Sequence, residues 1–148
     1  DFCQEIDARS ENAGTPISGQ RLMASFDDMA SVRPRMIELV RKLKRRGQTV
    51  AALTNNWHSG GLLEDRFTQL REEFDLMVES WKVGLRKPEV AIYELVLSRL
   101  GTRAEETVFL DDFGINLKPA RAMGMRTIKV GCVEDAIDGL YEVFGELL

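Results

Sequence analysis

The sequence contains few of the features that mark secreted, metal-binding or membrane proteins. It has two cysteines, Cys3 and Cys132, which lie far apart and lack the spacing of a metal site. So few cysteines favour a reducing, cytoplasmic compartment. No apolar run approaches the roughly 20 residues that a membrane-spanning helix needs, so no membrane association is expected. The N-terminus is polar and acidic, unlike a secretory signal peptide.

Positive charge is not in excess either. The chain has 20 lysines and arginines against 24 acids, a formal net charge of −4, so no nucleic-acid partner is expected. The basic run at 41–46 is interpreted as a solvated helix end, where cations interact favourably with the helix dipole. A length of 148 residues, with 44% hydrophobic and 30% charged residues, fits one globular domain with a real core.

From residue 31 onward, short apolar runs alternate with helical patterns. Four runs have strand character, at 49–53, 75–80, 107–110 and 127–130. The first is almost entirely apolar, as expected for a strand buried on both faces. Between the runs, apolar residues recur every three or four positions, which predicts helices, two of them opening at Pro34 and Pro88. The alternation predicts an α/β fold with a doubly wound parallel sheet.

Polar residues follow two of these runs and precede one predicted helix. Thr54 and Asn55 follow the first run, Asp111 and Asp112 follow the third, and Lys87 stands at a predicted helix start. Ligands of such folds bind at the carboxyl ends of the strands. A hydroxyl, a lysine and acids that hold Mg²⁺ together describe a phosphoryl site. Taken singly, each residue has a structural alternative: a loop cap, a surface lysine or an acidic turn.

Three segments, taken in order, resemble the haloacid dehalogenase-like hydrolases. They are LTNNW at 53–57, VGLRKP at 83–88 and VFLDDFGINLKPARAMGM at 108–125. The similarity is to the branch that includes the N-terminal phosphatase domain of soluble epoxide hydrolase and domains associated with acyl-CoA dehydrogenases. It implies a Rossmann-like core over residues 31–148. Residues 1–30, which lack a strand pattern, would be a remnant of the family's helical cap.

The resemblance implies a role for each matching residue, and a small phosphorylated compound as the substrate. Thr54 and Asn55 would bind the phosphoryl group, and Lys87 would neutralise both that group and the nucleophile. Asp112 would bind Mg²⁺ directly, with Asp111 as a supporting acid.

Three more residues near these motifs are interpreted in the same way. Asn116 would hydrogen-bond within the site, help to orient its parts and contribute to substrate binding. Trp57 either lines the substrate entrance or is a packing aromatic. His58 matches no catalytic position and is interpreted as a surface loop residue.

The nucleophile of the family is missing from this sequence. It belongs to an Asp-x-Asp motif that ends the first, central strand near the N-terminus. Asp27 and Asp28 are adjacent and follow a helical pattern, so they do not match. The sheet is therefore expected to lack its first strand, and our hypothesis is that a longer parent protein supplies it upstream. Without that acid no phospho-aspartate forms, and this chain alone is expected to be inert.

The sequence leaves open whether the chain is an enzyme. The leading prediction is a Mg²⁺-dependent phosphatase domain that acts through an aspartyl-phosphate when complete. One alternative is a metal-independent haloacid dehalogenase. Another is a non-catalytic binding or regulatory domain that retains the fold. A phosphoacceptor receiver domain is disfavoured, because its acids precede its threonine and lysine, whereas here they follow.

Overall fold

The computed structural model describes residues 2–22, 32–57 and 62–145. The chain forms two compact units, 1–33 and 34–148. In the first unit, helix α1 covers Phe2–Asn12. The chain then returns to this helix at Gly19, where an added Cβ would lie only 2.5 Å from the backbone oxygen of Cys3. Glycine is therefore required at that close approach.

Residues 23–31, which include part of this unit, lie outside the described residues. The interpretation of residues 1–30 as the remnant of a cap stays a prediction. Among the residues that the structure does describe, no helix is long and apolar enough to cross a membrane.

The second unit alternates helices with four short strands. Helix α3 begins at Pro34 and ends in a basic turn before Gly47, whose φ is +78°. This order, with proline at the first helical position and glycine just beyond the end, is the one expected from the sequence. The elements are α3 (Pro34–Arg45), β1 (Ala51–Thr54), α4 (Leu62–Glu73), β2 (Leu76–Glu79), α5 (Ser80–Val83), α6 (Val90–Leu100), η1 (Ala104–Glu106), β3 (Val108–Asp111), α7 (Gly114–Ala122), β4 (Arg126–Lys129) and α8 (Val133–Phe144).

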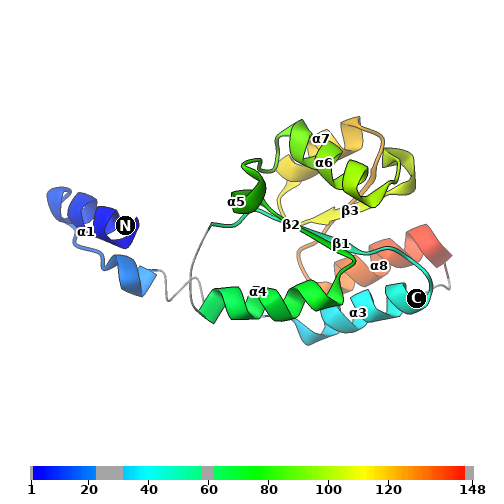
Figure 1. Cartoon of the computed structure of the whole chain (residues 1–148), viewed down its shortest axis with the longest axis horizontal. Helices are drawn as coiled ribbons and strands as arrows, with labels where there is room; N and C mark the ends of the chain where they lie inside the picture. The colour runs from blue at the N-terminus through cyan, green and yellow to red at the C-terminus, as the bar shows by residue number, and fades with distance from the viewer. Residues whose placement is uncertain (1, 23–31, 58–61, 146–148) are drawn as a thin grey trace. The chain divides into compact units, whose positions relative to one another are not determined.

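The four strands form two separate two-stranded parallel sheets, β1–β2 and β3–β4. Thr54 pairs with Glu79 in the first sheet, and Asp111 pairs with Lys129 in the second. Helices α6 and α7 lie on one side of the strands, and α3, α4 and α8 lie on the other (Figure 1). Helices on both faces of parallel strands confirm the predicted Rossmann-like α/β class.

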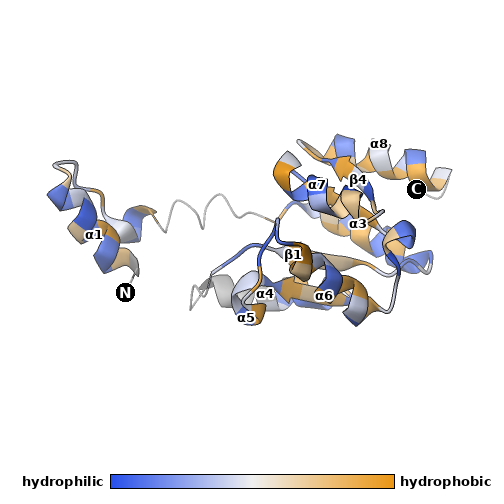
Figure 2. Cartoon of the chain, turned by 90° about the horizontal axis from the view of Figure 1, so that it is seen from above, coloured by the Kyte–Doolittle hydropathy of each residue, from blue (hydrophilic) through white to orange (hydrophobic). Residues whose placement is uncertain are grey.

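Apolar side chains gather in two clusters, one for each helical layer. The helices carry both hydrophilic and hydrophobic residues, as amphipathic helices on a core do (Figure 2). The first cluster joins β2, α6 and α7 through Val78, Ile92, Tyr93, Ala104, Ala120 and Met125. The second joins α3 to α8 through Leu39, Leu43, Ala136 and Leu140.

Three details differ from the sequence-based predictions. The strands begin or end one or two residues away from the predicted bounds, a normal uncertainty at element ends. Helix α6 begins at Val90, with Glu89 as its N-cap, so Pro88 and Lys87 lie in the turn before it. Residues 80–83, predicted as strand end and loop, form the short helix α5. In addition, every residue of β1 is only partly buried, although the sequence predicted burial on both faces.

Candidate active site

Lys87 joins the carboxyl ends of β1 and β3. Its Nζ donates to the backbone oxygen of Leu53 at 2.9 Å and to Asp111 Oδ2 at 2.7 Å. The side chains of Lys87 and Asp111 are 11% and 2% exposed. This is a nearly buried ion pair, in which each charge depends on the other because little water is left to solvate it. Of the two predicted acids, the structure brings Asp111 to Lys87 at the strand ends, and no contact joins Lys87 to Asp112.

Asp111 is also held by two donors besides Lys87. Its Oδ1 accepts hydrogen bonds from Phe113 N at 2.8 Å and from Asn116 Nδ2 at 2.9 Å. The buried Tyr93 hydroxyl in turn donates to Asn116 O at 2.7 Å. Burial, and then the charge of Asp111, raise the pKa of Tyr93 to about 12, so Tyr93 remains a donor at neutral pH. The network fixes the Asp111 carboxylate, because both of its oxygens accept hydrogen bonds from the protein.

The two adjacent acids occupy different environments. Asp111 is buried, whereas Asp112 is exposed. Within the described part of the chain, Asp112 has no hydrogen-bond or ion-pair partner. Since consecutive residues at a strand end point in different directions, Asp111 is built into the fold and Asp112 is left free for an external partner.

The side chain of Asn55 hydrogen-bonds to the backbone of Lys87. Its Nδ2 donates to Lys87 O, and its Oδ1 accepts from Lys87 N, both at 2.9 Å. This double contact fixes the loop that carries the lysine. Thr54, which ends β1, is partly buried, and its hydroxyl has no bonded partner among the described residues. Asn55 thus uses its side chain for positioning, while Thr54 keeps its hydroxyl available.

The sequence analysis missed a second buried acid, Glu79, which ends β2 and is 2% exposed. Its carboxylate accepts from Asn56 Nδ2 at 3.1 Å and from Arg71 Nη2 at 2.9 Å, and it pairs with Lys82 Nζ at 2.6 Å. Ser80 Oγ accepts from Asn56 N and donates to Asn56 O. Glu79 and Ser80 therefore anchor the loop that follows Thr54. The sequence signal that could have revealed Glu79 is an acidic residue at the end of a mostly apolar strand run.

Replacing Glu79 with glutamine is expected to weaken the dependence of stability on acid pH. Burial raises the pKa of Glu79, but hydrogen bonds from Lys82, Arg71 and Asn56 outweigh burial and hold the pKa below its ordinary value of 4.5. A carboxyl with a lowered folded-state pKa stabilises the fold above its unfolded pKa and loses that contribution as pH falls through the folded pKa. The stability difference between parent and Glu79→Gln should thus be large at pH 7 and shrink below pH 4.5.

Urea unfolding at pH 7, 5, 4 and 3 measures this difference. The exposed Glu142 offers a matched control, since Glu142→Gln should leave the pH dependence unchanged. A constant difference between the parent and Glu79→Gln at all four values would contradict the assignment.

Two sequence-based assignments concern residues near the rim. Trp57 is 47% exposed, and both of its interpretations, at a substrate entrance or as a partly buried packing aromatic, stay predictions. His58 lies outside the described residues. Among the described residues, no group of three or more histidines, cysteines or acids is arranged to hold a metal ion. Asp112 offers a carboxylate at this edge that no other described residue engages.

Comparison with known proteins identifies the family. Residues 1–124 match the model of a hydrolase family, the haloacid dehalogenase-like hydrolases. The chain is 42% identical over 119 residues to bifunctional epoxide hydrolase 2 of Rattus norvegicus, covering 78% of this chain and 22% of that protein. It is 36% identical over 146 residues to acyl-CoA dehydrogenase family member 10 of Mus musculus, covering 97% and 13%. The chain thus spans less than a quarter of the length of these relatives.

A smaller relative carries the word phosphatase in its name. The sesquiterpene phosphatase astK of Aspergillus oryzae is 36% identical over 118 residues, covering 74% of this chain and 57% of that protein.

Two solved structures have a fold similar to that of this chain. A predicted HAD-like family hydrolase from Porphyromonas gingivalis superposes with a TM-score of 0.69 at 21% identity, covering 94% of this chain and 71% of that one. A HAD family enzyme from Bacteroides thetaiotaomicron, an aspartate-to-alanine mutant in complex with magnesium and inorganic phosphate, superposes with a TM-score of 0.64 at 22% identity, covering 87% and 69%.

Proposed function

The chain belongs to the haloacid dehalogenase-like hydrolases, and we propose that it is the lysine- and acid-bearing part of a Mg²⁺-dependent phosphatase for small phosphorylated compounds. In its complete form the site would act through an aspartyl-phosphate. Phosphatases among the relatives and the magnesium and phosphate bound by a structural neighbour support this proposal.

The observation that carries the proposal is the bridge made by Lys87. One ammonium group contacts the ends of both β1 and β3, between Leu53 O and Asp111 Oδ2. It lies where an anionic group at the strand ends would need a positive charge. Thr54 ends β1, and its hydroxyl, which has no bonded partner among the described residues, would donate to a phosphoryl oxygen. A preorganised cation and donor of this kind stabilise charge that develops during transfer.

The chemistry of Asp112 fits a bound Mg²⁺. This ion keeps several waters and takes only one or two protein carboxylates, and Asp112 offers one that is exposed and unengaged. Asp111 would support the site through Asn116 and Lys87, since its own oxygens accept bonds from Asn116, Phe113 and Lys87. When bound, Mg²⁺ supplies charge that neutralises phosphate oxygens.

Within this mechanism the described residues bind and position. Asn55 holds the Lys87 backbone, Glu79 and Ser80 hold the loop after Thr54, and Tyr93 supports Asn116. The nucleophilic aspartate would come from an Asp-x-Asp strand that this sequence does not contain. A second candidate is a domain that retains the fold and binds without catalysis. The metal-independent dehalogenase is the other alternative.

Hydrolysis of para-nitrophenyl phosphate, with and without Mg²⁺, tests the proposal. The chain as it stands is expected to be inert, and the chain joined to an Asp-x-Asp strand is expected to hydrolyse the ester only with Mg²⁺. Release of chloride from 2-chloropropionate without metal would instead identify a dehalogenase. A joined form that folds yet performs neither reaction would leave the non-catalytic candidate.

A further inference from the structure

Helices α3 and α8 carry opposite charges. Helix α3 has five basic residues and one acid, whereas α8 has four acids and no base. Both helices lie on the same side of the strands (Figure 1), and they contact each other. A basic ridge and an acidic ridge therefore run next to each other on one face of the 34–148 unit.

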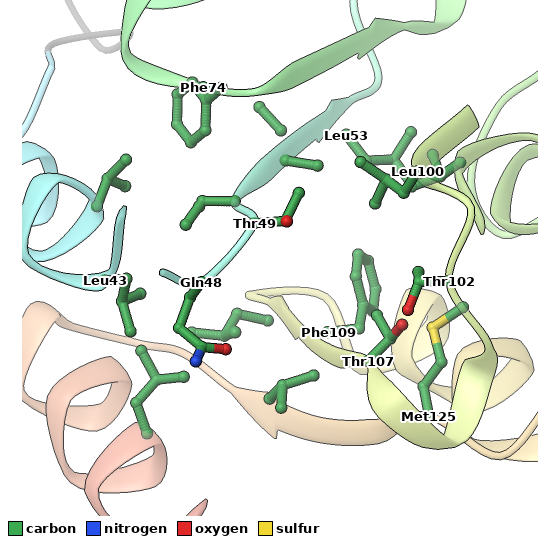
Figure 3. A pocket seen from close by; sticks show the side chains of 18 of the residues that line it. Leu43, Gln48, Thr49, Leu53, Phe74, Leu100, Thr102, Thr107, Phe109 and Met125 are labelled. Atoms are coloured by element: carbon green, nitrogen blue, oxygen red, sulfur yellow. The ribbon is translucent and has the colours of Figure 1, made fainter. Parts of the chain in front are cut away.

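The two helices run in the same direction and begin at the same level. Arg35, in the first turn of α3, forms an ion pair with Glu134, in the first turn of α8. Leu43, in the later half of α3, packs in one cluster with Leu140, in the later half of α8. Leu43 also lines a pocket beside the strands (Figure 3). The inner sides of both helices are thus apolar, which leaves their charged residues on the outer side.

The cations of α3 that face α4 are already paired within the chain. Arg41 pairs with Glu73, the last residue of α4, and Lys44 pairs with Asp75, just beyond that helix. These ion pairs join α3 to the segment that leads into β2. The positive charge that they leave over lies on the side of α3 toward α8 and solvent.

Two cations of α3, Lys42 and Arg45, form what we call the basic pair. Neither makes an ion pair or hydrogen bond with any residue that the structure describes. Lys42 follows Arg35 by seven residues, which is about two helical turns, so it lies on the side of α3 that faces α8. Arg45 is exposed at the end of the helix. The basic pair therefore places two uncompensated positive charges in the last turns of α3.

Helix α8 presents an acidic pair, Asp138 and Glu142, at nearly the same height. Both residues are exposed, and within the described ranges 2–22, 32–57 and 62–145 neither has an ion-pair or hydrogen-bond partner. At a rise of 1.5 Å per residue, Glu142 lies about 12 Å beyond Glu134 along α8. By the same rise, Lys42 lies about 10 Å beyond Arg35 along α3. The two pairs thus occupy the same level of neighbouring ridges.

Tyr141 lies between the two ridges. It follows Glu134 by seven residues, so it is on the side of α8 that faces α3. It is 52% exposed. Tyrosine is enriched among the residues that contribute most to protein interfaces, because its ring adds apolar contact area while its hydroxyl stays hydrogen-bonded. The seam between α3 and α8 therefore combines an aromatic centre with opposite charges on its two sides.

We infer that this face binds the same face of a second copy of this chain, about a two-fold axis that runs parallel to α3 and α8 and passes between them. This rotation places α3 of one copy opposite α8 of the other and keeps every height along the axis unchanged. Each basic pair then faces an acidic pair, and the two Tyr141 rings meet near the axis. An axis perpendicular to the helices in the same plane would instead oppose like charges.

The size of this face makes the dimer weak and dependent on charge. Each helix has 12 residues and is about 18 Å long and about 10 Å wide, so the two helices together cover a planar area of about 360 Å². Specific interfaces of standard size bury about 800 Å² per partner. The inference concerns an interface and does not depend on the proposed phosphatase activity.

Analytical ultracentrifugation of the 148-residue chain at rising protein concentration tests the dimer. At low ionic strength the chain should pass from monomer to dimer. Salt at 1 M, where the Debye length is about 3 Å, should weaken the association at least tenfold, because it screens the facing charges. A chain that stays monomeric at every concentration, or a dimer that salt does not weaken, would overturn the inference.

Charge reversal tests the arrangement itself. The acidified variant carries Lys42→Glu and Arg45→Glu, so both of its ridges are acidic. The basified variant carries Asp138→Lys and Glu142→Lys, so both of its ridges are basic. Each variant alone should self-associate at least tenfold more weakly than the parent chain. A mixture of the two should form a heterodimer, because every ridge then faces one of opposite charge, and a chain with both pairs reversed should form the homodimer again.

A matched control makes the same change of charge on the other side of the strands. Arg99→Glu with Lys118→Glu, at exposed sites on α6 and α7, should leave the association unchanged. If a double variant fails to fold, Arg45→Glu and Glu142→Lys repeat the comparison as single changes. A dimer that the reversals do not weaken, or a mixture that associates no better than its separate components, would show that these ridges do not face each other.

Discussion

Lys87→Met is expected to lower the free energy of unfolding by about 3–5 kcal/mol, the usual result of leaving one charge of a buried pair uncompensated. Lys87 and Asp111 are 2.7 Å apart, and the Asp111 side chain is 2% exposed. Without the ammonium, the carboxylate keeps only its two donors, Phe113 N and Asn116 Nδ2. Urea unfolding with a common slope measures the change.

A double-mutant cycle separates the ion pair from the packing of the lysine stem. Lys87→Met combined with Asp111→Asn removes both charges and should recover much of the loss, because no uncompensated charge remains buried. Arg103→Met breaks an ion pair with Glu106 whose side chains are 75% and 52% exposed, and it should change stability little. Additive losses in the double mutant would show that the two charges do not depend on each other.

The fold class and the meeting point of the site residues could both be predicted from the sequence, but for different reasons. Alternating strand runs and helical patterns predicted the doubly wound class, because burial periodicity is a local property of the chain. The convergence of Thr54, Lys87 and Asp111 was predicted because parallel strands end at one edge. Both arguments need only strand order and direction.

Contacts between distant side chains could not be predicted in the same way. Nothing local shows that Asn55 uses its amide on the Lys87 backbone, 32 positions away, or that Tyr93 supports Asn116. The expected helix start at Pro88 was wrong, because the proline lies in the turn before Val90. Every residue of β1 is only partly buried, because burial depends on tertiary neighbours that the apolar composition of the run cannot reveal.

Asp112→Asn is expected to abolish Mg²⁺-dependent hydrolysis of para-nitrophenyl phosphate by the chain joined to an Asp-x-Asp strand. A neutral amide is a poor ligand for Mg²⁺, which prefers carboxylate oxygens, and Asp112 offers the free carboxylate at this edge. Stability should change by less than about 0.5 kcal/mol, because Asp112 is exposed and makes no bond to the described residues. Loss of activity without loss of stability separates this acid from Asp111, whose replacement disturbs both.

Calorimetric titration with Mg²⁺ gives a readout that does not depend on turnover, and the variant should bind the ion at least tenfold more weakly. The exposed Asp138 of α8 provides the control, since Asp138→Asn should preserve both binding and hydrolysis. If Asp112→Asn retained full activity and affinity, the metal would have to be held by other residues. Asp112 would then be only a solvated residue in the turn after β3. The assignment of metal binding to Asp112 and of structural support to Asp111 would be wrong.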